Sequence, residues 1–218
     1  MQNLEAIADQ IREKFDVQTA ARDKALTLSR ALIRHSALAI RAVHRDDLPV
    51  MNEHLEEAAK LAKTLKEDLA FHPDIYHTGY TQDALKEFVE AKVTCALIKA
   101  QPLVTLDELD VPHATYLKGL SEVVGELRRR TLDELRNGYS AECERLLSLM
   151  DEIYAVLVTM DYPDAITHGL RRQTDIARSI IERTRGDVTF SLRGEHLEKK
   201  IIELSEKLGI TEENTDQT

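Results

Sequence analysis

Helix-breaking residues are confined to a few short segments of this chain, and that distribution is the strongest constraint on its fold. Glycine occurs 8 times and proline 5 times in 218 residues. Between these breakers, apolar residues recur at the spacing of one helix face, as they do across residues 26–43. No alternation of apolar and polar residues, which is typical of strands, competes with this pattern. The sequence therefore predicts an all-α protein.

The breakers divide the chain into six helical regions. An interruption near residues 16–19 is an alternative within the first region, and a frayed or kinked helix is expected near Gly186 and Gly194. The segment 103–113 is expected to be a loop with one short helical turn. The expected helices span residues 3–44, 46–70, 81–99, 113–136, 141–160 and 163–207.

No linker divides these helices. We therefore predict one domain over residues 1–210, a single-domain antiparallel helical bundle, followed by a polar, disordered tail at 211–218. No apolar run is long enough to span a membrane, and the N-terminus lacks the apolar core of a signal peptide. Cys95 and Cys143 lie inside helical patterns without metal-site spacing, which is typical of reduced thiols. These features predict a cytoplasmic protein.

The net charge of −10 argues against nucleic-acid binding by the surface as a whole. One local stretch, residues 22–45, is nevertheless strongly basic. Helix faces neutralised by neighbouring acids are the alternative interpretation. If the basic face is functional, it would attract an RNA backbone, and the candidate RNA-binding residues are Arg30, Arg34, Arg41 and Arg45.

Two acidic couples lie in the predicted helices. Glu87 and Glu90 belong to KEFVEAK, and Glu122 and Glu126 belong to SEVVGEL. Residues three or four apart share a helix face, so each couple projects its carboxylates together. If the two faces meet, four carboxylates converge and require a cation, and oxygen ligands suit a hard ion such as Mg²⁺. The same spacing recurs elsewhere in this acidic chain, so a solvated face is the alternative.

The surroundings of the couples favour a functional role. Apolar residues cover nearly the whole circumference of helix 81–99, so the strip with the first couple is expected to be partly buried. On helix 113–136 the second couple lies opposite the apolar arc, which alone suggests solvent. Gly119 and Gly125 border that polar face, and an interior glycine costs a helix about 1 kcal/mol. We therefore expect another backbone, or a bulky substrate, to approach closely there.

At these residues the sequence resembles the translin family, and translin-associated factor X (TRAX) more than translin itself. Residues 87–91 match an E-Y/F-V-E-A stretch, and residues 116–128 match the form Y-L-x-G-x-x-D-x-x-G-E-L-x. Residues 23–45 contain counterparts of a D-K, L-S-R and H-R helix. Residues 170–187 resemble the C-terminal helix of prokaryotic members. The basic stretch of translin is missing at HTGYTQDALK, which favours the catalytic branch.

The resemblance implies a translin-like α-α superhelix of about seven helices that assembles into a closed homo-octamer. It also implies a magnesium-dependent endoribonuclease site that faces the interior and acts on single-stranded or nicked RNA, with Mn²⁺ as an alternative metal. By position, Glu87, Glu90 and Glu122 would be the catalytic acids, and with Glu126 they would be the metal ligands. The usual family residue at the third position is Asp, so Glu122 is one methylene longer.

Two other functions stay open. One is a non-catalytic oligomer that binds single-stranded RNA or DNA, which the change from Asp to Glu122 would favour. The other is a structural helical assembly whose ligand is another protein. The sequence has no P-loop or nucleophile elbow. No histidine lies one turn from either acidic couple, which excludes the Glu-x-x-His pattern of di-iron bundles.

Overall fold

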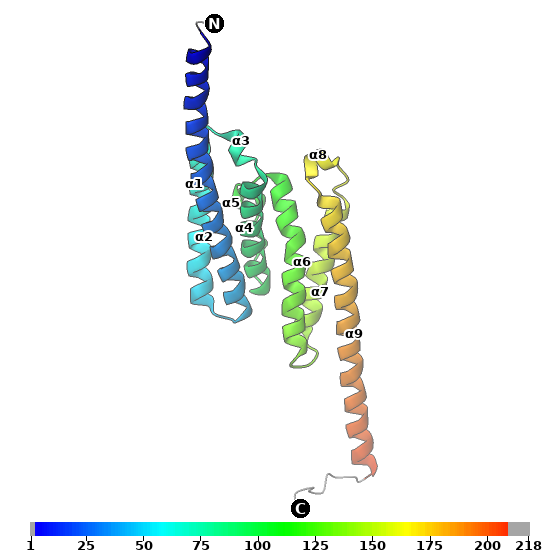
Figure 1. The fold of residues 1–218 in the computed structure, drawn as a ribbon. Coiled ribbons are helices and arrows are strands. Elements are labelled where there is room, and N and C mark those ends of the chain that lie inside the picture. Colours follow the sequence, from blue (N-terminus) through cyan, green and yellow to red (C-terminus); the bar gives the residue numbers. More distant parts are fainter. Residues whose placement is uncertain (1–2, 209–218) are drawn as a thin grey trace, which may run out of the picture.

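The computed structural model describes residues 3–208, and every regular element in that range is an α-helix (Figure 1). The all-α prediction is confirmed. The predicted tail at 211–218 and its boundary at residue 210 lie outside the described residues. The long helices are α1 Leu4–His44, α2 Leu48–Asp68, α4 Gly79–Ile98, α6 His113–Leu135, α7 Ala141–Val158 and α9 Leu170–Leu208. Single turns within the connectors are α3 Pro73–Tyr76, α5 Leu106–Leu109 and α8 Asp164–Thr167.

The first and last long helices are continuous past the positions where an interruption of the first and fraying or a kink of the last had been considered. Helix α1 passes through residues 16–19 without interruption, because no glycine or proline occurs between residues 4 and 44. Helix α9 likewise continues through Gly186 and Gly194. A single glycine costs a helix only about 1 kcal/mol, whereas a proline costs about 3 kcal/mol, so two isolated glycines do not end this helix.

Local signals account for the helix ends. The carboxylate of Asp47 accepts a hydrogen bond from the Val50 amide at 3.3 Å and caps α2, whose first turn contains a proline. Helix α9 starts at Leu170 and not at residue 163 as expected. His168 and Gly169 have φ values of 51° and 88°, and this left-handed backbone ends the short helix α8 before α9 begins.

The helices form a row. Helix α1 packs against α2 and α4, α4 packs against α6, and α6 packs against α7 and α9. Figure 1 shows the first half of α1 and the last half of α9 extending beyond the row at opposite ends. No helix within residues 3–208 combines the length and hydropathy needed to cross a bilayer. Both extensions expose large apolar side chains: Leu4, Ile7, Ile11 and Phe15 on α1, and Phe190, Leu197, Ile201, Leu204 and Leu208 on α9.

Helices α4 and α6 run in the same direction, because the connector 99–112, which contains α5, returns to the level at which α4 begins before α6 starts (Figure 1). Their register is fixed at both polar and apolar contacts. The Thr115 hydroxyl donates to Gln82 Oε1 at 2.5 Å, and Gly119 packs against Val89 one turn further along. Parallel packing in this register places the two acidic couples at the same level of the row.

Candidate metal centre

Three of the four predicted acids converge. Glu87 and Glu90 of α4 and Glu122 of α6 each offer a carboxylate oxygen, and these three atoms lie within 4.8 Å of one another. All three side chains are partly buried. The side-by-side packing of α4 and α6 brings the first couple to the second, as the sequence predicted for these residues. We refer to Glu87, Glu90 and Glu122 as the acidic triad.

The fourth acid, Glu126, is directed to another helix. Its Oε2 lies 2.6 Å from His44 Nε2 on α1 and 3.6 Å from Arg129 Nη1. The hydrogen bond to His44 is the main reason that the pKa of Glu126 is lowered, against the opposing effect of burial. Sequence reasoning grouped this residue with the triad, whereas the structure ties it to α1.

Glu90 occupies the most unfavourable position for a negative charge. Burial raises its pKa from the ordinary value of 4.5 to about 8, and the neighbouring carboxylates of Glu87, Glu122 and Glu126 add to this effect. Without another cation, Glu90 therefore carries a proton at neutral pH. An additional positive charge among these oxygens would favour its ionised form.

A lysine that sequence reasoning missed already contacts the triad. Lys86 Nζ lies 2.8 Å from Glu122 Oε2 and 3.3 Å from Glu87 Oε1, and its side chain is only 14% exposed. Burial alone would lower the pKa of Lys86, but the hydrogen bond and negative charge of Glu122, together with those of Glu87, raise it. Helical spacing gives no signal for this contact, since Lys86 and Glu87 are adjacent in sequence and Glu122 belongs to another helix.

The last helix supplies an amide to the same group. Gln173 Nε2 of α9 lies 3.4 Å from Glu122 Oε1. The carbonyl oxygen of Gln173 is buried and has no hydrogen-bond partner within the described part of the chain. The three convergent carboxylates form an all-oxygen donor set, which fits a hard divalent cation such as Mg²⁺ or Mn²⁺.

The predicted RNA-binding arginines form one stripe on α1. Arg30, Arg34, Arg41 and Arg45 are all exposed; at 100° per residue the three arginines within α1 fall within about 40° of one another, and Arg45 is the C-cap residue of the helix. None of them has an ion-pair partner within 4.0 Å among residues 3–208. His44 lies at the same end of α1, so its contact with Glu126 links the helix that carries this arginine stripe to α6.

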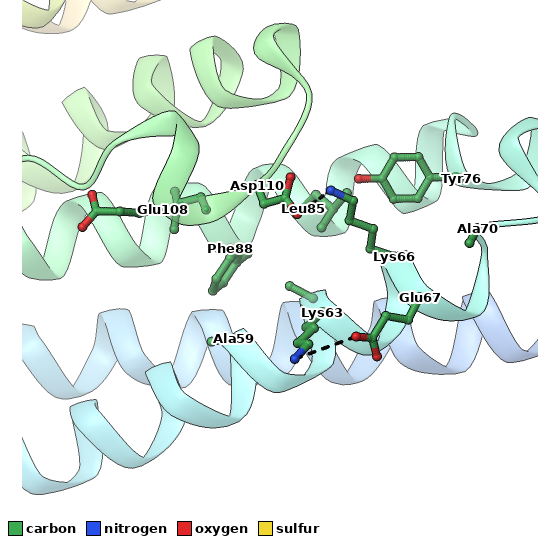
Figure 2. A pocket seen from close by; sticks show the side chains of 12 residues that line it. Ala59, Lys63, Lys66, Glu67, Ala70, Tyr76, Leu85, Phe88, Glu108 and Asp110 are labelled. Atoms are coloured by element: carbon green, nitrogen blue, oxygen red, sulfur yellow. Dashed lines mark ion pairs between the residues drawn. The ribbon is translucent and has the colours of Figure 1, made fainter.

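A separate pocket of about 530 Å³ lies between α2, α4 and the connector that contains α5 (Figure 2). Its lining is apolar on the α4 side, with Leu85 and Phe88, and it includes an ion pair between Lys66 and Asp110. None of the four predicted acids lines it. This pocket is therefore distinct from the acidic triad.

Comparison with known proteins gives the family. No family model matches the sequence. An uncharacterised protein of Methanocaldococcus jannaschii is 34% identical over 194 residues, which cover 86% of each chain. Among solved structures, AfC3PO in complex with duplex RNA has a TM-score of 0.80 and 31% identity, over 86% of this chain and 97% of that one. A crystal structure of AfC3PO gives a TM-score of 0.79 with the same identity and coverage.

The structure of apo-NeC3PO is similar in fold, with a TM-score of 0.77 and 24% identity over 84% of this chain and 96% of that one. Because the Methanocaldococcus jannaschii protein and AfC3PO are each more than 30% identical to this chain over most of both chains, the similarity extends beyond the fold. The chain belongs to the translin/C3PO family.

Proposed function

We propose that this chain is a metal-dependent endoribonuclease of the TRAX-like branch, which acts on single-stranded or nicked RNA inside a homo-oligomeric shell. The observation that supports this proposal most strongly is the convergence of oxygen atoms from Glu87, Glu90 and Glu122 within 4.8 Å. The similarity to AfC3PO, solved with duplex RNA, supports RNA as the ligand.

Under this proposal the acidic triad holds Mg²⁺, with Mn²⁺ as an alternative. When bound, the metal supplies a Lewis acid and a coordinated water of lowered pKa. Glu90 would be ionised when the site holds a cation, because the added positive charge would offset its burial and the neighbouring carboxylates. Glu126 supports the site from its edge, with its orientation fixed by His44. The longer side chain of Glu122 has enough reach to contact both Lys86 and Gln173.

The arginine stripe supports RNA binding by its charge. Its four guanidinium groups are exposed and have no ion-pair partner among the described residues, so they are available to phosphates. No aromatic RNA-reading motif accompanies the stripe. We therefore expect the chain to bind RNA through its backbone, with weak sequence preference and a strong dependence on salt.

The exposed apolar residues of α1 and α9 support self-association, and we propose an octamer as the assembly. A helix that extends from the row with an unpartnered apolar stripe is typical of a helix that packs against another subunit. Replacing Leu197 and Ile201 of α9 by Glu is expected to reduce the native mass measured by light scattering. A matched replacement of the exposed polar residues Glu198 and Lys200 by Gln should leave the mass unchanged. Equal masses for both variants and the wild type would exclude α9 from the interface.

The nuclease proposal is tested with labelled single-stranded RNA and Mg²⁺. The wild-type protein should cleave it, and EDTA should abolish cleavage. The variant Glu87→Gln/Glu90→Gln should lose more than the roughly 10–100-fold that removal of an outer metal partner costs. Glu53 and Glu56 have the same spacing on the exposed face of α2, so Glu53→Gln/Glu56→Gln is the matched control and should keep full activity. Equal activity of both variants would contradict the site, and an inactive wild type would contradict the enzyme.

The alternative is a non-catalytic oligomer that binds single-stranded RNA or DNA. The observation that favours it is that Lys86 already neutralises part of the acidic triad through its contacts with Glu122 and Glu87. This alternative predicts salt-sensitive binding with no cleavage over long incubation. Binding and cleavage measured on the same RNA in the same buffer therefore separate the two functions.

A further inference from the structure

We propose that Lys86 is an internal cation of the acidic triad and competes with the metal for the same carboxylates. This inference rests on the metal role proposed for the triad and adds a means of regulating it. Lys86 Nζ lies 2.8 Å from Glu122 and 3.3 Å from Glu87, so it takes up oxygen lone pairs that a metal ion would also use. Metal binding then requires the ammonium group to leave.

The charge of the site explains why a cation is needed in the metal-free state. Glu87 and Glu122 are partly buried carboxylates that repel each other, whereas Glu90 gains no direct ion pair from the lysine. The ammonium group compensates one acid from each helix, Glu87 of α4 and Glu122 of α6. A divalent ion placed among the same oxygens would repel the ammonium at close range, so the two cations exclude each other.

The backbone geometry permits this exchange without movement of the helices. The carbonyl oxygen of Lys86 lies against Gly119, where an added Cβ atom would approach it to 2.9 Å, so the main chain of α4 is fixed there. The lysine side chain itself has four rotatable bonds and reaches a partly exposed site. Displacement of Lys86 is therefore a change of side-chain conformation alone.

The competition is tested by metal binding, without RNA. Titration calorimetry with Mn²⁺ on EDTA-stripped, dialysed protein compares the wild type with two neutral variants, Lys86→Met and Lys86→Gln. Both should bind Mn²⁺ about 10-fold more tightly than the wild type, within the usual range of coupling between two sites. Lys86→Arg keeps the charge and should retain an affinity close to that of the wild type. Lys92→Met removes a partly buried lysine of α4 that has no ion pair among residues 3–208, and it should change nothing.

A second measurement follows thermal unfolding. In EDTA, Lys86→Met should unfold at a lower temperature than the wild type, because the triad has lost its cation. Adding Mn²⁺ should raise the unfolding temperature of Lys86→Met by more than that of the wild type. Circular dichroism establishes that each variant is helical before it is titrated.

The outcomes separate this inference from the proposed function. Equal Mn²⁺ affinity in the wild type and both neutral variants would overturn the competition and leave the metal site intact. Mn²⁺ binding by the neutral variants alone would support the competition and contradict a metal-dependent activity of the wild type. Absence of Mn²⁺ binding in every protein would overturn both proposals.

Discussion

Gly119 of α6 faces Val89 of α4 so closely that a Cβ atom at position 119 would lie 2.7 Å from the Cβ of Val89. Real Cβ atoms do not approach a neighbour to that distance, so a methyl group there must push the two helices apart. Overpacking of this kind costs about 1–3 kcal/mol. We therefore expect Gly119→Ala to lower the free energy of unfolding by that amount in urea denaturation, and to weaken Mn²⁺ binding because α4 and α6 carry the acidic triad.

Gly125 provides the matched control on the same helix. A Cβ atom at Gly125 would have no neighbour within 4 Å. Gly125→Ala should therefore raise the free energy of unfolding by up to about 1 kcal/mol, because alanine favours a helix more than glycine does, and it should leave the Mn²⁺ affinity unchanged. The same loss of stability in both variants would contradict the close approach of the helices. The sequence predicted close contact at both glycines. Within one subunit, the structure shows a close neighbour at Gly119 and none at Gly125.

The contact between His44 and Glu126 links α1 to α6, and its removal should cost stability. The His44 side chain is only 2% exposed, and its Nε2 lies 2.6 Å from the carboxylate. In His44→Ala, Glu126 loses the partner that is the main cause of its lowered pKa while it stays partly buried. We expect the free energy of unfolding at pH 7 to fall by about 1–3 kcal/mol. His196 is exposed on α9, so His196→Ala is the control and should be neutral in the same assay.

Local patterns predicted the helices because helix formation and helix termination depend on near neighbours. The apolar stripes and the segments rich in breakers marked all six long helices, and Asp47 with its following proline marked the start of α2. The direction of α4 relative to α6 was not predictable in this way. It depends on the path of the connector 99–112, which has helical signals for only one short turn.

The candidate site likewise has residues that the sequence predicts and contacts that it does not. Glu87 with Glu90, and Glu122 with Glu126, could be predicted as couples because spacing on one helix is visible in the sequence, and the family pattern joined the two couples into one site. The contacts of Lys86 with Glu122 and of His44 with Glu126 join residues 36 and 82 positions apart. Such pairs depend on how the helices pack, so no spacing rule within a single helix reveals them.

The raised pKa of Glu90 predicts a pH dependence of stability in the metal-free protein. The pKa is about 8 in the folded chain and near its ordinary value of 4.5 in the unfolded chain. Between these values the folded state holds a proton that the unfolded state has lost. The free energy of unfolding therefore falls as pH rises, by up to about 1.4 kcal/mol per pH unit from this group, and levels off above pH 8.

The variant Glu90→Gln isolates this effect, because it removes the titrating group and keeps a similar shape. Urea denaturation in EDTA at pH 5, 6.5 and 8 is the measurement. The advantage of Glu90→Gln over the wild type should grow with pH across this series. A constant difference between the two proteins would show that Glu90 titrates at its ordinary pKa in the folded chain.

The arginine stripe predicts how salt changes RNA binding. Arg34 and Arg41 are exposed and have no ion-pair partner among residues 3–208, so each is free to neutralise a phosphate. Arg34→Gln/Arg41→Gln should weaken binding to single-stranded RNA and make the slope of log K against log salt shallower by about 1.4, since each phosphate contact contributes about 0.7. Arg136→Gln/Arg178→Gln removes the same charge from residues that pair with Asp133 and Glu182. Fluorescence anisotropy at several salt concentrations distinguishes the two double variants. Loss of general charge alone would weaken RNA binding equally in both variants. Loss of phosphate contacts would make the salt slope shallower only in the variant of the arginine stripe.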